Sequence, residues 1–191
     1  MISTFLELQR LKRLDRTGWT LRGLAAGSES IAAHSYGVTV AAMMLADGLR
    51  ARGVAVNVER VLRMALVHDW AEARTGDLPR AAAHYYGAET RRAAERSAFG
   101  DIVESLGCEA VQYRNLHDEY EERSSLEAQV VKAADTIDLL TQALTFERAG
   151  ARGLDEFWEA ADATDLNLEG VLGEVVRGAV TALVEERAKH L

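Results

Sequence analysis

The sequence is poor in cysteine, proline and aromatic residues, and it lacks a long apolar run. Its 191 residues include one cysteine, Cys108, and one proline, Pro79, and 6% of the residues are aromatic. A single cysteine excludes an internal disulfide and a zinc site built from several cysteines. No uncharged apolar stretch approaches the roughly 18 residues of a membrane span, and residues 1–13 lack the features of a secretory signal. We therefore expect a cytoplasmic location and no membrane partner.

Positive charge is also scarce. The chain has 22 Lys and Arg residues against 30 Asp and Glu residues, which gives a net charge of −8. This balance excludes a broad electrostatic surface for a nucleic acid polymer. What is present is an ordinary globular composition, with 48% hydrophobic and 27% charged residues. The length indicates a single domain over residues 1–191.

Almost every segment has the residue pattern of an α-helix. Ala, Leu, Glu and Arg dominate, and alternation with a period of two is absent. A loop that contains three glycines is expected over residues 15–28. The expected helices cover residues 4–13, 30–52, 58–69, 89–106, 109–122, 125–149, 155–163 and 168–189. These segments predict an all-α fold.

A histidine interrupts the apolar face of the helix expected over residues 30–52. That face carries Ile31, Val38, Ala42, Leu45 and Leu49. His34 falls on the same face, so its ring should point inward. A lone histidine in this position can also be an ordinary core residue, and His34 by itself does not establish a site.

A His-Asp pair ends the apolar face of the helix expected over residues 58–69. Continuing the face that carries Val61 and Ala65 by one turn reaches His68 and Asp69. A buried carboxylate without a partner is unfavourable by several kcal/mol, and a cation opposite it removes that penalty. The pair therefore indicates a metal or a paired charge, and a solvated helix end is the alternative.

A further acid lies on the apolar face of the helix expected over residues 125–149. Asp135 has Val131 one turn before it and Leu139 one turn after it. The same argument about buried charge applies, with an ion pair to Lys132 or to an arginine elsewhere in the chain as the alternative.

Taken together, these positions offer two imidazoles and two carboxylates, all predicted to face one core. The set is His34, His68, Asp69 and Asp135. Two nitrogen and two oxygen ligands suit a divalent cation such as Mn, Co, Ni, Fe, Mg or Zn, and they leave positions open for water and substrate. We expect one such cation as cofactor. A bound cation of this kind lowers the pKa of a water molecule and makes it a nucleophile.

Two more acids follow the His-Asp pair. Glu72 comes four residues after His68 and shares its face if the helix continues. Asp77 lies in the Gly-Asp-Leu-Pro turn. Either acid could serve as a general acid or base. The alternatives are an exposed acid for Glu72 and an ordinary turn residue for Asp77.

Five segments together resemble a known family. They are Arg-Thr-Gly-Trp-Thr-Leu-Arg at 16–22, Glu-Ser-Ile-Ala-Ala-His-Ser at 29–35, Met-Ala-Leu-Val-His-Asp-Trp-Ala-Glu-Ala at 64–73, Gly-Asp-Leu-Pro at 76–79 and Val-Lys-Ala-Ala-Asp at 131–135. In this order they resemble the HD-domain metal-dependent phosphohydrolases, in particular the branch of small helical 5′-deoxynucleotidases.

The resemblance implies a fold, a site and a reaction. The fold would be the HD-domain helical bundle, commonly a homodimer. His34, His68, Asp69 and Asp135 would bind the cation, with Glu72 orienting the attacking water and Asp77 close to the leaving 5′ oxygen. The segment before the first histidine would bind the nucleotide through Arg16, Trp19 and Arg22, although Trp19 could equally be a core aromatic residue.

The chain departs from the family pattern at three positions. Ala33 stands where an acid often precedes the first histidine, Gly18 stands where an arginine can precede the tryptophan, and Trp70 follows the His-Asp pair where a smaller residue is usual. Nucleotide preference is therefore the part of the resemblance that these positions put most in question.

Other candidate groups are weaker. His84 and His117 lie where enzymes with two metals place additional histidines, but residues 117–122 have the pattern of an acidic helix surface. Cys108 follows Gly107 without a plausible general-base constellation, so a thiol nucleophile is not expected. Glutamates alternate with Arg91, Arg92 and Arg96 as on a solvated helix face.

Three functions remain open at this point. The first is hydrolysis of deoxyribonucleoside 5′-monophosphates. The second keeps the metal site and changes the substrate to a triphosphate, a cyclic nucleotide or a pathway metabolite. The third is a nucleotide-binding regulatory module with little turnover, which Ala33 alone favours.

Overall fold

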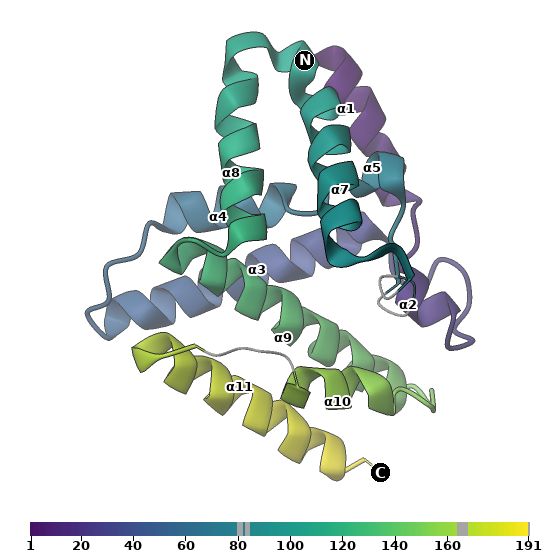
Figure 1. The fold of residues 1–191 in the computed structure, drawn as a ribbon. Coiled ribbons are helices and arrows are strands. Elements are labelled where there is room, and N and C mark those ends of the chain that lie inside the picture. Colours follow the sequence, from purple (N-terminus) through teal and green to yellow (C-terminus); the bar gives the residue numbers. More distant parts are fainter. Residues whose placement is uncertain (80–81, 83–84, 164–167, 191) are drawn as a thin grey trace. The chain divides into compact units, whose positions relative to one another are not determined.

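The computed structural model describes residues 1–79, 82, 85–163 and 168–190. Within these ranges every regular element is a helix (Figure 1). The only β-type contact among the described residues is an isolated bridge between Asp15 and Ser30. The predicted all-α fold is therefore confirmed. No helix in the described ranges is long and apolar enough to cross a membrane.

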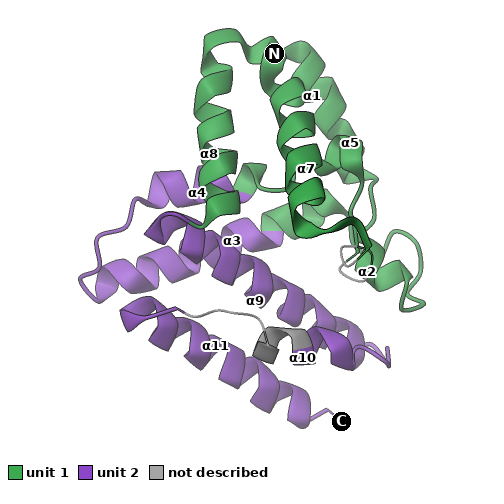
Figure 2. Ribbon diagram, in the orientation of Figure 1, with its two compact units in different colours: residues 1–36, 66–123 green, residues 37–65, 124–191 purple. Residues whose placement is uncertain are grey.

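The chain divides into two compact units, each made of two separate stretches of sequence (Figure 2). The first unit contains residues 1–36 and 66–123, and the second contains residues 37–65 and 124–191. One boundary falls inside helix α3 (Ile31–Ala51) and another inside helix α4 (Val58–Val67).

The first unit is built around two consecutive helices. Its elements, besides the first residues of α3 and the last of α4, are α1 (Ile2–Leu8), η1 (Gln9–Lys12), α2 (Thr17–Thr20), α5 (Glu72–Thr75), α7 (Ala88–Val103), η2 (Glu104–Glu109) and α8 (Ala110–Glu122). Helices α7 and α8 pack against each other, and α5 and α1 pack against α7. Gly107, at a φ of 66°, allows η2 to reverse the chain between them. Phe99, Ile102 and Leu116 are buried in this core.

The second unit contains most of α3 and α4 together with α9 (Leu126–Arg148), α10 (Asp155–Ala163) and α11 (Gly170–Ala188). Ser125 begins α9, because its side chain accepts a hydrogen bond from the backbone N–H of Ala128 at 3.1 Å. Helices α10 and α11 both pack on α9. Arg187 of α11 reinforces this packing with an ion pair to the buried Glu147 at 2.7 Å.

A glycine in α3 allows an acid of α9 to come close. A Cβ atom added at Gly37 would overlap the carboxylate of Asp138, and both residues belong to the second unit. Any larger residue at position 37 would have to displace Asp138. The glycine is thus a packing requirement, although it lies in the middle of a helix, where glycine is unfavourable by itself.

Most predicted helices lie close to their observed bounds. Helix α10 has the bounds predicted, and α3 and α9 differ from prediction by one residue at each end. Three details were wrong: the expected helix 4–13 is an α-helix followed by a 3₁₀ turn, the expected loop 15–28 contains the short α2, and α4 ends at Val67 instead of residue 69.

Candidate metal and phosphate site

His34 is placed by the first turn of α3. The Ser30 side chain accepts a hydrogen bond from the Ala33 backbone N–H at 3.2 Å and so starts the helix. One turn later His34 follows the buried Ile31 and precedes the buried Val38, and its side chain is 1% exposed. The inward orientation predicted from the apolar face is therefore confirmed.

His68 and Asp69 lie in a tight turn after α4. The Trp70 N–H donates to the Val67 carbonyl at 3.1 Å, and the Glu72 N–H donates to the Asp69 carbonyl at 3.1 Å. These bonds span three residues instead of the four of an α-helix. The helix therefore does not continue to Glu72, so the condition under which His68 and Glu72 would share a helical face is not met.

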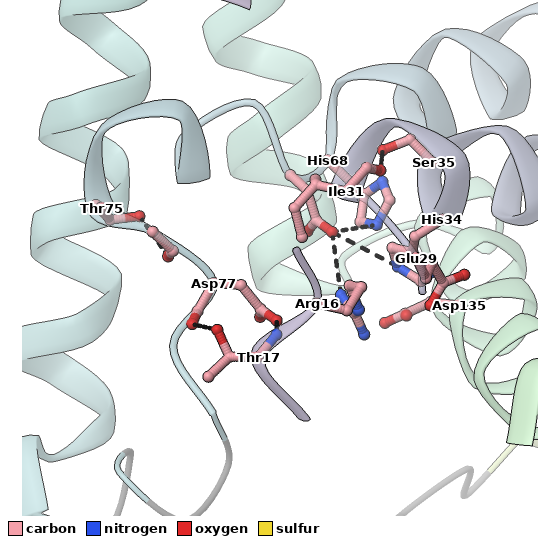
Figure 3. A network of polar contacts seen from close by, with 12 residues as sticks. Arg16, Thr17, Glu29, Ile31, His34, Ser35, His68, Thr75, Asp77 and Asp135 are labelled. Carbon is pink, nitrogen blue, oxygen red and sulfur yellow. Dashed lines mark hydrogen bonds and ion pairs between the residues drawn. The ribbon is translucent and has the colours of Figure 1, made fainter. Parts of the chain in front are cut away.

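Two imidazole rings and a guanidinium converge on one oxygen of Asp69. The Oδ2 atom lies 3.2 Å from His68 Nε2 and 3.5 Å from His34 Nε2. Nη1 of Arg16 lies 3.6 Å from the same oxygen (Figure 3). The histidine ring centroids are 5.5 Å apart and nearly edge to face. Residues far apart in sequence thus meet inside the first unit.

The electrostatics of this cluster favour an ionised carboxylate. Burial alone would raise the pKa of Asp69. The neighbouring His68, His34 and Arg16 outweigh burial and hold that pKa well below its usual range. Two imidazole nitrogens directed at a buried, ionised carboxylate oxygen form a donor set that fits a divalent transition-metal cation.

Glu72 is a second buried acid, at the start of α5. It is 6% exposed, and its Oε2 atom has no hydrogen-bond partner among the described residues. Burial, with the negative charges of Asp69 and Asp77, raises the pKa of Glu72 to about 10. The two acids therefore have opposite protonation behaviour, as acid and base groups at a functional site often do.

Asp77 holds the beginning of α2. Its Oδ2 accepts a hydrogen bond from the backbone N–H of Thr17 at 2.5 Å, and its carbonyl accepts one from the Thr17 hydroxyl at 2.8 Å (Figure 3). Arg16 is the residue immediately before this short helix. Asp77 therefore fixes the segment that carries Arg16.

The structure places the three predicted nucleotide-binding residues differently from one another. The Arg16 side chain is 17% exposed and faces Asp69. Trp19 is 1% exposed, and its indole N–H donates to Glu29 Oε2 at 2.5 Å. Arg22 is exposed to solvent. Sequence reasoning missed Glu29, although it begins the segment 29–35 and no apolar face explains its burial.

Comparison with known proteins decides the family. A family profile described as "HD domain" matches residues 8–164. The chain belongs to the HD-domain family. It is 34% identical to zebrafish (Danio rerio) "5′-deoxynucleotidase HDDC2" over 95% of this chain and 85% of that protein. It is 31% identical to fission yeast (Schizosaccharomyces pombe) "5′-deoxynucleotidase hdd1" over 100% of this chain and 96% of the relative.

Solved structures share the fold of this chain. The chain is similar to the PH0347 protein of Pyrococcus horikoshii, with a TM-score of 0.84, 36% identity and coverage of 97% of this chain and 99% of the other. It is also similar in fold to an HD-domain phosphohydrolase of Listeria innocua, with a TM-score of 0.73, 23% identity and coverage of 97% and 88%. The predicted HD-domain helical fold is therefore confirmed.

Two departures from the HD-domain pattern can be located. Ala33 is exposed while its neighbour His34 is buried. Trp70 packs between aromatic rings of α7 and α8, with centroids 6.2 Å from Phe99 and 5.5 Å from Tyr113. The large residue after the His-Asp pair thus belongs to an aromatic stack of the first unit.

The second His-Asp dipeptide has a different environment. His117 is 2% exposed and stacks on Phe99 with centroids 4.2 Å apart. Asp118 accepts a hydrogen bond from Arg96 at 2.8 Å. No group of three possible metal ligands among the described residues includes His117. His84 lies outside the described residues, and Cys108 is exposed.

The last predicted ligand, Asp135, lies on α9 in the second unit. Its Oδ2 accepts a hydrogen bond from Lys132 Nζ at 2.7 Å, and its side chain is 17% exposed. The ion pair considered from the sequence is therefore present. Its role as a metal ligand stays a prediction.

Proposed function

We propose that this protein is a metal-dependent phosphomonoesterase that hydrolyses deoxyribonucleoside 5′-monophosphates to a deoxynucleoside and phosphate. The observation that carries the proposal is the convergence of His34 and His68 on the ionised Asp69 beside the buried Glu72. Relatives named 5′-deoxynucleotidases, which match over most of the chain, support the choice of substrate.

We propose His34, His68 and Asp69 as ligands of one divalent cation, with Asp135 as the fourth on the basis of the sequence. When bound, such a cation acts as a Lewis acid towards phosphoryl oxygens and lowers the pKa of a water. Its identity among Mn, Co, Mg, Ni, Fe and Zn is a matter for experiment, because this donor set accepts several of them.

The chain's own residues supply binding and proton transfer. A guanidinium matches the geometry of a phosphate group, and the exposed part of Arg16 beside Asp69 is suited to that contact. We propose that Glu72 orients the attacking water, and that Asp77 lies near the leaving 5′ oxygen. In the overall reaction water attacks phosphorus, the P–O5′ bond breaks, and a proton reaches the leaving oxygen.

A phosphate-release screen tests the proposal. Purified protein is loaded with each candidate cation and offered ribonucleoside and deoxyribonucleoside mono- and triphosphates and cyclic nucleotides. Release confined to deoxyribonucleoside monophosphates supports the proposal. Release from triphosphates or cyclic nucleotides only would move the activity to another substrate, and no release with any cation would favour a binding module.

We also propose a cytoplasmic homodimer, as the family resemblance implies. Light scattering coupled to gel filtration measures the mass directly: a mass twice that of the 20.9 kDa chain supports the dimer, and a monomer at micromolar concentration contradicts it.

A further inference from the structure

One buried acid secures both ends of the short helix that follows Arg16. The Arg16 backbone N–H donates to the carbonyl of Glu29 at 3.0 Å. Three residues later, the Trp19 indole N–H donates to the carboxylate of the same Glu29 at 2.5 Å. Glu29 thus contacts the segment that carries Arg16 at two points, although it lies 13 positions further along the chain than Arg16.

The environment makes these contacts strong. Glu29 is 8% exposed and Trp19 is 1% exposed. Little water competes for a hydrogen bond in a buried location, so the contact between the Trp19 indole N–H and the Glu29 carboxyl group is strong. Removing the acceptor would leave a buried indole N–H unsatisfied.

Neighbouring contacts complete the support of the 15–30 loop. The Ile31 N–H donates to the Leu14 carbonyl at 2.9 Å, which closes the loop at its base. Asp77 binds Thr17 from the other side. Arg16 is the residue between these supports, and its guanidinium lies 3.6 Å from Asp69.

We propose that Glu29 is a positioning residue for phosphate recognition: it acts through Trp19 and through its own carbonyl to hold Arg16 against the Asp69 cluster. In this role Glu29 touches neither the substrate nor the cation. Trp19 serves as the buried anchor of the loop. The kinetic part of the proposal rests on the proposed function, and the structural part does not.

A direct role at the cation is the competing explanation for Glu29. One of its carboxylate oxygens lies within 4.8 Å of a ring nitrogen of His34. The variant Glu29→Gln separates the two roles, because an amide carbonyl still accepts the indole hydrogen bond while the negative charge is lost. Bound metal in Glu29→Gln should equal that of the wild type, and loss of the metal would overturn the proposal.

The first experiment measures the anchor without reference to activity. The chain has three tryptophans, so an indole ¹H–¹⁵N NMR spectrum is simple, and Trp19→Phe identifies the Trp19 signal. We expect this proton to exchange slowly in the wild type and in Glu29→Gln, and rapidly in Glu29→Ala. Glu89→Gln removes an equal charge at an exposed ion pair with Arg92 and serves as the control. Unchanged exchange in Glu29→Ala would contradict the anchor.

The second experiment measures whether Glu29 acts through Arg16. We expect Glu29→Ala to raise the KM for a deoxyribonucleoside monophosphate about tenfold, as for loss of one hydrogen bond to a charged group. The effect on kcat should be smaller. The double variant with Arg16→Ala should be no worse than Arg16→Ala alone, because the two changes remove the same contact. Glu29→Gln should recover most of the affinity.

Additive effects in the double variant, or a loss confined to kcat, would overturn the proposal. If the wild type releases no phosphate from any nucleotide, the proposed function fails on its own. The affinity for inorganic phosphate, measured by calorimetry on the same variants, then replaces KM. If Glu29→Ala does not fold, Trp19→Phe removes the same hydrogen bond and should weaken phosphate binding in the same way.

Discussion

At the scale of single residues, the site combines two acids with opposite requirements. Asp69 is stabilised as an anion by its three nitrogen-bearing neighbours, whereas burial and nearby negative charge disfavour an ionised Glu72. Two carboxyl groups separated by three positions in sequence can therefore perform different tasks: the ionised Asp69 is suited to binding a cation, and Glu72 is suited to acid-base chemistry.

We predict that Glu72→Gln will lower kcat about 10²- to 10⁴-fold, the usual range for loss of a general acid or base. Bound metal, measured by elemental analysis, should be unchanged because Glu72 is not a proposed ligand. Asp69→Ala should lose the metal and the activity together. Near-normal turnover in Glu72→Gln would refute the assigned role.

Asp77 offers a separable prediction. Asp77→Asn keeps a side-chain oxygen that can accept the hydrogen bond from the Thr17 N–H, but it removes the negative charge. We expect this variant to unfold at the wild-type temperature with a reduced kcat. Asp77→Ala should lower both the unfolding temperature and kcat, since it also removes the oxygen that accepts the hydrogen bond from the Thr17 N–H at the start of α2. If Asp77→Asn has full activity, Asp77 serves only to hold the loop.

At the scale of helices, α8 carries a buried histidine that should make stability depend on pH. Burial lowers the pKa of His117 from its ordinary value of 6.5, against the raising effect of Asp118. The unfolded chain therefore binds the proton more readily than the folded one. The free energy of unfolding should fall as the pH decreases through 6.5 towards the folded-state pKa.

Urea titrations between pH 8 and pH 5 measure this dependence. We expect His117→Gln to flatten the acid side of the profile relative to the wild type, whatever its effect on stability at pH 8. His190→Gln changes an exposed histidine near the end of the chain and serves as the control. An unchanged slope in His117→Gln would show that other groups set the acid dependence.

Helix α11 is attached to α9 and α10 through Arg187. This residue binds the buried Glu147, donates to Asp155 at 2.6 Å and lies 4.8 Å over the Trp158 ring. Replacing Arg187 with Met would leave the Glu147 charge buried, so we expect a loss of about 3 kcal/mol in the free energy of unfolding. The double variant with Glu147→Met should recover part of this loss, and a further loss would contradict the explanation.

Hydrophobic periodicity was sufficient to predict the long helices but not the short α2 or the turn between α4 and α5. The apolar face of α4 continues in sequence to His68, and periodicity cannot reveal that the backbone changes to shorter hydrogen bonds after Val67. Likewise, the inward orientation of His34 can be predicted because it lies on the apolar face of α3. The hydrogen bond between Trp19 and Glu29 could not be predicted, because both residues lie in a loop without periodic structure. Contacts between distant segments decide such details.

At the scale of the whole molecule, the half-buried Asp135 has two possible roles, as the partner of Lys132 in an ion pair or as a ligand of the cation. Its ion pair with Lys132 is present, and its role as a ligand is proposed. We predict that Asp135→Asn will weaken cation binding at least about tenfold, since even changes next to a ligand commonly have that effect. Lys132→Met removes the ion pair and keeps the carboxylate, so it should retain the metal. Equal metal affinity in Asp135→Asn and the wild type would exclude Asp135 as a ligand.

The guanidinium beside Asp69 has a consequence for handling the protein. Arg16 is a fixed cation of the chain, 3.6 Å from Asp69 Oδ2, so part of the counter-charge for that acid is encoded in the polypeptide itself. The negative charge of Asp69 therefore keeps a positive neighbour, Arg16, while one metal ion is exchanged for another. Stripping and reloading the protein with different metals in succession should accordingly be possible without unfolding it.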